Sequence, residues 1–202
     1  MTGQMLDCRH MALALIGLLL LVPALALGEV AAERAEKPSP GAWPDRVYAW
    51  RYNPQHAPAW LDAAAAKAMV LEAAKRWAAC GVDMRLLGDT DRAPGAMDGG
   101  NVVGWSLDIP PRLRGLTLGR ARAGRLLERD VAIRPDREEF RRSPRLLQKV
   151  ITHELGHAIG LTHSLRCDDV MTLAADCPKV DPETLPLSPT PNDLARCRAL
   201  YP

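Results

Sequence analysis

The most informative segment of this 202-residue chain runs His153-Glu154-Leu155-Gly156-His157-Ala158-Ile159-Gly160-Leu161-Thr162-His163. If the segment is helical, His153 and His157 stand one turn apart on the same face, so both imidazoles can bind one metal ion. Glu154 is rotated by about 100° around the axis, which places it beside that face. Gly160 can adopt a left-handed conformation that turns the chain and returns His163 to the same point. The spacing therefore predicts a three-histidine metal site.

Three neutral imidazoles and one open position form the ligand set of a catalytic zinc site, because closed structural sites usually hold four protein ligands. We expect one catalytic Zn²⁺ held by His153, His157 and His163. Zinc lowers the pKa of its water and polarises a scissile carbonyl group. Glu154 is predicted to be the general base that takes the proton and delivers it to the leaving amine.

This segment lies in a helix predicted from Ser143 to Gly160. Ser143-Pro144 is a favourable pair for the N-cap and the first turn, and Gly160 favours the C-terminal end. A wide apolar face runs along the helix: Leu146, Leu147, Val150, Ile151, Leu155, Ala158 and Ile159. Such a helix is predicted to be buried, so polar ligand groups within it need a chemical role.

Other elements are predicted on the N-terminal side of this helix. The Ala-rich segment from Asp62 to Cys80 has apolar residues at helical spacing and is followed by Gly81, which favours a helix end. Runs of alternating or β-branched residues predict strands: Arg46–Tyr52, Val82–Leu87, Val102–Leu107, Leu116–Ala121 and Asp130–Arg134.

The overall composition is that of a globular protein. Hydrophobic residues make up 48% and charged residues 25% of the chain, values that exclude a disordered protein. Lys and Arg number 26 against 24 Asp and Glu, giving a net charge of +2. That balance supplies no basic excess to neutralise phosphates, so nucleic acid is not an expected partner.

The N-terminus has the pattern of an export signal. In residues 1–28, a polar start containing Arg9 precedes an apolar run over residues 11–27 that ends in small residues. We expect this signal peptide to be cleaved, leaving a linker at residues 29–42 and one catalytic domain at residues 43–202. The alternative is an uncleaved anchor, and only in that case is a membrane contact expected. A secreted or periplasmic location is predicted.

The cysteines fit an oxidising compartment. Four of them follow the predicted signal: Cys80, Cys167, Cys177 and Cys197. An even number in an exported chain predicts two disulfides with three possible connectivities. A zinc site of four thiolates would favour C-x-x-C pairs, which these spacings do not provide. We favour a local Cys167–Cys177 bridge, which leaves Cys80–Cys197.

The motif resembles the signature of the metzincin metallopeptidases, H-E-x-x-H-x-x-G-x-x-H followed by a Met-turn. Met171 stands where the methionine of that turn is expected beneath the metal. Ser164, directly after the third histidine, resembles the matrixins among the metzincins. The segment Asp193–Tyr201 is similar to the closing helix of matrixins, in which an aspartate supports the Met-turn by hydrogen bonding. Asp193 and Gly160 are therefore expected to support the site from outside the ligand set.

The resemblance implies a zincin-like α+β fold with a twisted, mostly parallel sheet, a long active-site helix, a Met-turn and a C-terminal helix. It also implies a zinc metalloendopeptidase that acts as a monomer on peptides or proteins, with an extended substrate pairing to an edge strand such as Leu116–Ala121. A structural zinc is not expected, because only His56 remains to bind it. No calcium loop is readable, and the family's cysteine-switch propeptide is absent.

Two other functions fit the same ligands. The first is a non-catalytic, exported zinc-binding module, which would have no need of the carboxylate of Glu154. The second is a zinc amide hydrolase of narrow specificity, which the motif alone does not separate from an endopeptidase because zinc chemistry also serves other amides.

Overall fold

The computed structural model describes residues 41–173, 177, 181, 183–184 and 186–202. Its elements in chain order are β1 (Val47–Asn53), α2 (Ala63–Arg76), the 3-10 turn η1 (Ala78–Cys80), β2 (Asp83–Asp89), β3 (Val102–Trp105), β4 (Gly115–Arg122), β5 (Arg125–Ile133), α3 (Glu138–Arg142), α4 (Pro144–Ala158) and α5 (Pro191–Leu200). The predicted signal peptide and residues 29–40 of the predicted linker lie outside the described residues.

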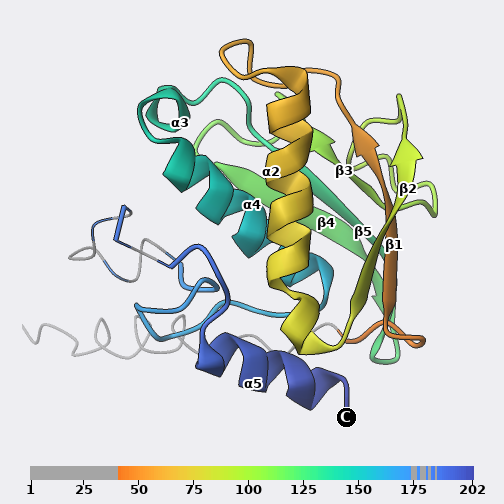
Figure 1. The fold of residues 1–202 in the computed structure, drawn as a ribbon. Helices are drawn as coiled ribbons and strands as arrows, with labels where there is room; N and C mark the ends of the chain where they lie inside the picture. The colour runs from red at the N-terminus through yellow and green to blue at the C-terminus, as the bar shows by residue number, and fades with distance from the viewer. Residues whose placement is uncertain (1–40, 174–176, 178–180, 182, 185) are drawn as a thin grey trace, which may run out of the picture. The chain divides into compact units, whose positions relative to one another are not determined.

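The five strands form one sheet in the order β2-β1-β3-β5-β4. β1 pairs in parallel with β2 and β3, β3 pairs in parallel with β5, and β4 alone is antiparallel to its neighbour β5. Helix α4 packs against β4 and β5, and α2 packs against α4 (Figure 1). The predicted α+β class with a mostly parallel sheet is confirmed, and the predicted strand Leu116–Ala121 lies within the edge strand β4.

Local signals at both ends define α4. The Ser143 hydroxyl accepts a hydrogen bond from the Leu146 amide at 3.1 Å, and Pro144 occupies the first turn. Gly160 has a φ of +96°, and a Cβ there would lie 2.2 Å from the carbonyl oxygen of Gly41. A side chain at position 160 would therefore be both strained and blocked, which makes glycine the residue that lets the chain leave the helix here.

Aromatic side chains anchor α4 within the core. The indole nitrogens of Trp43 and Trp77 donate to the carbonyl oxygens of Ala158 and Thr152, each at 2.9 Å. The Tyr201 hydroxyl donates to the carbonyl oxygen of Ile159 at 2.7 Å. Two of these bonds satisfy carbonyl groups at the helix end, where backbone acceptors lack a partner within the helix. The helix that carries His153 and His157 is thus fixed from three distant parts of the chain.

Two disulfides join parts of the described chain. Cys80–Cys197 links η1 to α5 across 117 positions, and Cys167–Cys177 closes a loop of 10 positions. This is the pairing that the sequence favoured. The long bridge removes more conformational freedom from the unfolded chain than the short one, so it stabilises the folded state more. It also attaches α5 covalently to η1.

None of the described helices combines the length and apolar character needed to cross a lipid bilayer.

Candidate metal centre

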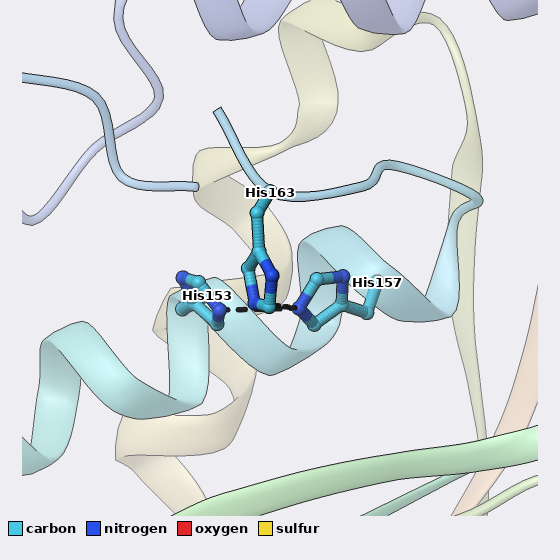
Figure 2. A group of neighbouring side chains, drawn as sticks. All are labelled: His153, His157 and His163. Carbon is cyan, nitrogen blue, oxygen red and sulfur yellow. Dashed lines mark hydrogen bonds between the residues drawn. The ribbon is translucent and has the colours of Figure 1, made fainter. Parts of the chain in front are cut away.

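Three imidazole rings converge at the C-terminal half of α4. His153 and His157 project from adjacent turns of the helix, and His163 reaches them from the loop that follows (Figure 2). The Nε2 atom of His157 lies 3.1 Å from Nε2 of His153 and 3.2 Å from Nε2 of His163. Nitrogen atoms of all three rings fall within 4.8 Å of one another, a group that could hold a metal ion.

Backbone carbonyl groups fix the orientation of two of these rings. Nδ1 of His153 lies 2.8 Å from the Val170 oxygen, and Nδ1 of His157 lies 2.7 Å from the Leu161 oxygen. A carbonyl oxygen only accepts, so each Nδ1 carries the proton and each Nε2 presents a lone pair. Burial lowers the pKa of both rings, well below the usual value for His153. Both imidazoles are therefore neutral at pH 7, the form that binds metals.

This arrangement fits a cation at the centre of the group. Two lone pairs 3.1 Å apart, with no proton between them, repel each other in this half-buried site. A metal ion held by these three histidines would replace that repulsion with coordination. Imidazole ligands in sets of three, with a further position open to solvent or substrate, are characteristic of catalytic zinc.

Glu154 lies beside the histidines but outside the group that could hold a metal. Its side chain is 7% exposed, and burial raises its pKa to about 7. The Thr117 hydroxyl on β4 lies 2.8 Å from Oε2 of Glu154 and 2.9 Å from its backbone oxygen. A Cβ at Gly115 would lie 2.7 Å from Cγ of Glu154. At the start of β4, the absence of a side chain at Gly115 therefore leaves room for this carboxylate, and the hydroxyl of Thr117 holds it by a hydrogen bond.

Met171 packs directly beneath α4. It is fully buried, and a Cβ at Gly156 would lie 2.3 Å from its sulfur atom. Its carbonyl oxygen accepts a hydrogen bond from the Ser164 amide at 2.8 Å, which ties it to the residue after His163. Gly156 is thus the position that allows the methionine to approach the helix between the two ligand histidines.

Asp193 connects α5 to this turn. Its buried carboxylate accepts hydrogen bonds from the amides of Val170 at 2.9 Å and Met171 at 3.4 Å, and from Thr190. Because the carbonyl of Val170 in turn holds Nδ1 of His153, the carboxylate fixes the peptide that orients a ligand. The predicted support of the methionine turn by Asp193 has this geometric form.

Three contributors to the site escaped the sequence reasoning: Thr117, Asp169 and Arg196. Asp169 is fully buried and accepts hydrogen bonds from Ser164 at 2.5 Å and Asn192 at 2.6 Å, as well as from Thr190. Arg196 donates to the carbonyl oxygen of His163 at 3.1 Å. None of the three belongs to a local motif. Thr117 and Arg196 form hydrogen bonds with residues far away in the chain, and Asp169 does so with Asn192 and, within one loop, with Ser164.

The Cys167–Cys177 bridge lies in the same region. Cys167 follows His163 by four positions, and Cys177 follows Met171 by six. Cys177 is buried, and its sulfur lies 3.5 Å from the Thr172 hydroxyl. The disulfide therefore closes a loop of the chain that contains Met171.

Comparisons with known proteins agree with this geometry. The family model described as Matrixin matches residues 68–202, which include the three histidines, Glu154, Met171 and Asp193. No curated protein matches the chain. Solved structures with a match number 33 chains. One belongs to the GM1 bound form of the ECX AB5 holotoxin, with 15% identity over 75% of this chain and 79% of that chain and a TM-score of 0.48, too distant to bear on function. The chain belongs to the matrixin family, whose members are zinc-dependent metalloproteases.

Proposed function

We propose that this protein is a zinc endopeptidase in which His153, His157 and His163 hold one zinc ion and Glu154 is the general base. The observation that carries the proposal is the convergence of three half-buried imidazole side chains next to a buried carboxylate that is not one of the ligands. A purely structural zinc site would gain nothing from placing this carboxylate in its apolar surroundings.

The residues of the chain divide the chemistry between them. Zinc, when bound, supplies a Lewis acid that polarises the scissile carbonyl and makes water more acidic. Glu154 accepts the proton of the attacking water at a carboxylate oxygen and then gives it to the amine that leaves. A carboxyl group whose pKa is raised to about 7 by burial is suited to both steps at neutral pH. Thr117 keeps the carboxylate aimed by its hydrogen bond to Oε2.

The substrate that we propose is an extended peptide lying along β4. This strand pairs with β5 on one side only and lies at the edge of the sheet order, so its other side offers backbone donors and acceptors to a peptide. The hydrogen bond from Thr117 of β4 to Glu154 places this edge next to the carboxylate. A peptide added to the sheet here would bring one of its carbonyl groups to the three histidines.

We place the enzyme outside the cytoplasm. Its two disulfides fit an extracellular protein, because reducing compartments keep thiols free. Export through the predicted signal of residues 1–28 and removal of that segment belong to the same proposal.

The direct test is digestion of a diverse peptide library by zinc-loaded protein, with the cleaved bonds identified by mass spectrometry. We expect internal cleavage of many peptides, loss of all cleavage after chelation of the metal, and recovery on addition of one equivalent of zinc. Cleavage of one or a few peptides alone would favour the narrow amide hydrolase. Stoichiometric zinc without any hydrolysis would favour the non-catalytic module and contradict the proposal.

Thr117 offers a second test of the role of Glu154. Replacement of Thr117 by valine removes the hydroxyl while keeping the shape of the side chain. A hydrogen bond to a charged group contributes about 1.5–3 kcal/mol, so we expect kcat to fall roughly 10- to 100-fold, with KM and zinc content unchanged. Steady-state kinetics on one peptide from the library measures this.

The matched control is Thr117→Ser, which keeps the hydroxyl and should retain most of the activity. If the serine and valine variants lose kcat equally, the hydroxyl does not position the carboxylate, and the effect of the valine variant comes from packing alone.

A further inference from the structure

Lys149 is a buried cation that the proposed mechanism does not use. It lies on α4, four positions before His153, so its side chain continues the row of His153 and His157 by one helical turn. Only 6% of the residue is exposed. Lysine is rarely buried to this extent unless an acceptor or a carboxylate pairs with it. Its burial one helical turn from His153, one of the residues placed to bind the metal, therefore needs a physical explanation.

No such partner is present in the described part of the chain. Lys149 has no hydrogen bond and no ion pair there, whereas other charged groups buried to a similar degree are satisfied. The carboxylate of Glu128, for example, is fully buried and is paired with Arg120 at 2.5 Å and with the Gly99 amide at 2.8 Å. The unpaired ammonium of Lys149 is thus an exception within this core.

The charges around Lys149 are mainly positive. Burial lowers the pKa of the lysine to about 8, and the nearby charge of Arg114, just before β4, adds to the effect. Arg114 is ion-paired with Glu139 at 2.9 Å, and Arg137 pairs with the same carboxylate at 2.8 Å. With a pKa of about 8, the ammonium is still mostly protonated at pH 7. Lys149 and Arg114 therefore bring two positive charges close together between the start of β4 and the first half of α4.

The ammonium is not completely enclosed. Among the described residues, the indole nitrogen of Trp50 is both sealed from solvent and without a hydrogen bond, whereas Nζ of Lys149, which also makes no hydrogen bond, is not sealed in this way. Its aliphatic stem is therefore buried, and a small part of the side chain that includes Nζ stays accessible. An incoming group can reach that head without unfolding the helix, which a completely enclosed lysine would not allow.

We propose that Lys149 binds a carboxylate of the peptide substrate, one helical turn from the metal ligands, and so determines specificity. The proposal rests on the function proposed above. The carboxylate has two possible sources, an Asp or Glu side chain close to the scissile bond or the free C-terminus of a short peptide. Both would form a charge-assisted hydrogen bond with the ammonium at a site that is shielded from bulk water.

The test uses matched peptides derived from a bond that the zinc-loaded protein cleaves. In one arm, Glu and Gln are exchanged at each of the positions flanking the scissile bond. In the other arm, the C-terminus is free or amidated at varied distances from that bond. We expect kcat/KM to be roughly 10- to 100-fold higher for the carboxylate form at one position of one arm, as a charge-assisted bond of about 1.5–3 kcal/mol would give. The arm that responds identifies the source.

Lys149→Met should remove this preference selectively. The variant keeps the buried stem but lacks the charge, so kcat/KM for the carboxylate peptide should fall to that of its neutral partner, which itself should be unchanged. Lys75→Met on α2, where the lysine is exposed, is the matched control and should keep the full preference. Dissociation constants of the zinc-loaded Glu154→Gln variant for the same peptides, with and without Lys149→Met, should show the same ratio without any turnover.

Three outcomes are distinct. A wild-type protein that cleaves peptides with no preference for a carboxylate in either arm overturns the role of Lys149 and leaves the endopeptidase proposal intact. A preference that persists in Lys149→Met also overturns it, since another residue must then bind the carboxylate. A protein that cleaves no peptide at all contradicts the proposed function itself.

Discussion

Replacement of Glu154 by glutamine is expected to leave zinc fully bound and to remove essentially all peptide hydrolysis. The carboxylate is not one of the three groups placed to hold the metal, so its loss should not weaken zinc binding. Glutamine has nearly the same shape and can still accept the hydrogen bond from Thr117, but its amide cannot take a proton from water. General base catalysis contributes about 10²- to 10⁴-fold, so the residual activity should be about 1% of wild type or less.

Two measurements on the same preparation decide this prediction. Elemental analysis should give one zinc per chain for both proteins, and digestion of the peptide library should yield products from the wild type alone. A Glu154→Gln variant that cleaves the library as fast as the wild type would refute the assignment of the base. Loss of zinc from the variant would show that the carboxylate belongs to the ligand set.

Replacement of Asp193 by alanine is expected to destabilise the fold and to weaken zinc binding together. The change leaves the buried amides of Val170 and Met171 without their acceptor, and it removes the partner of the Thr190 amide at the start of α5. Leaving buried donors unsatisfied costs about 1–3 kcal/mol each. We therefore expect the free energy of unfolding of the metal-free protein to fall by about 3 kcal/mol or more.

The effect on zinc follows from the connection through Val170. Groups that orient a ligand histidine typically change metal affinity by about 10- to 100-fold, and here the Val170 carbonyl holds Nδ1 of His153. Urea unfolding of the metal-free protein and competition with a chelator measure the two effects separately. Asp91→Ala, which removes an exposed carboxylate after β2, should change neither. Unaltered zinc affinity in Asp193→Ala would show that the turn keeps its position without this carboxylate.

The parts of the fold that the sequence predicted well are those with local signals. The boundaries of α4 match the prediction, because Ser143-Pro144 and Gly160 act through their own backbone and nearest neighbours. The helix predicted over Asp62–Cys80 is instead an α-helix that ends at Arg76, followed by a 3-10 turn. The spacing of apolar residues does not distinguish an α-helical turn from a 3-10 turn, so the sequence did not predict the change at Arg76.

The strand predicted over Asp130–Arg134 begins earlier, since β5 runs from Arg125 to Ile133. Its first half contains Glu128 and Arg129, charged residues that indicate a loop when read alone. In the structure Glu128 is fully buried because Arg120 of the neighbouring strand pairs with it. A partner on another strand is not visible in local sequence, so the extent of β5 was missed.

The same reason explains which site residues were found. The histidines, Glu154 and Gly160 lie in one short motif whose spacing encodes their geometry. Met171 and Asp193 were found through the resemblance to matrixins. Thr117 acts on a residue 37 positions away, and the carboxylate of Asp169 binds groups from two separate segments. Contacts of that kind exist only after the chain has folded.

The attachment of α5 to the metal ligands sets an order of events during synthesis. Asp193 and Arg196 of α5 support His153 and His163, yet α5 follows every ligand in the chain. A growing chain that already contains the three histidines still lacks these supports and the cysteine that pairs with Cys80. The complete support of the metal ligands is therefore acquired last, after the segment through Leu200 has emerged and formed its disulfide.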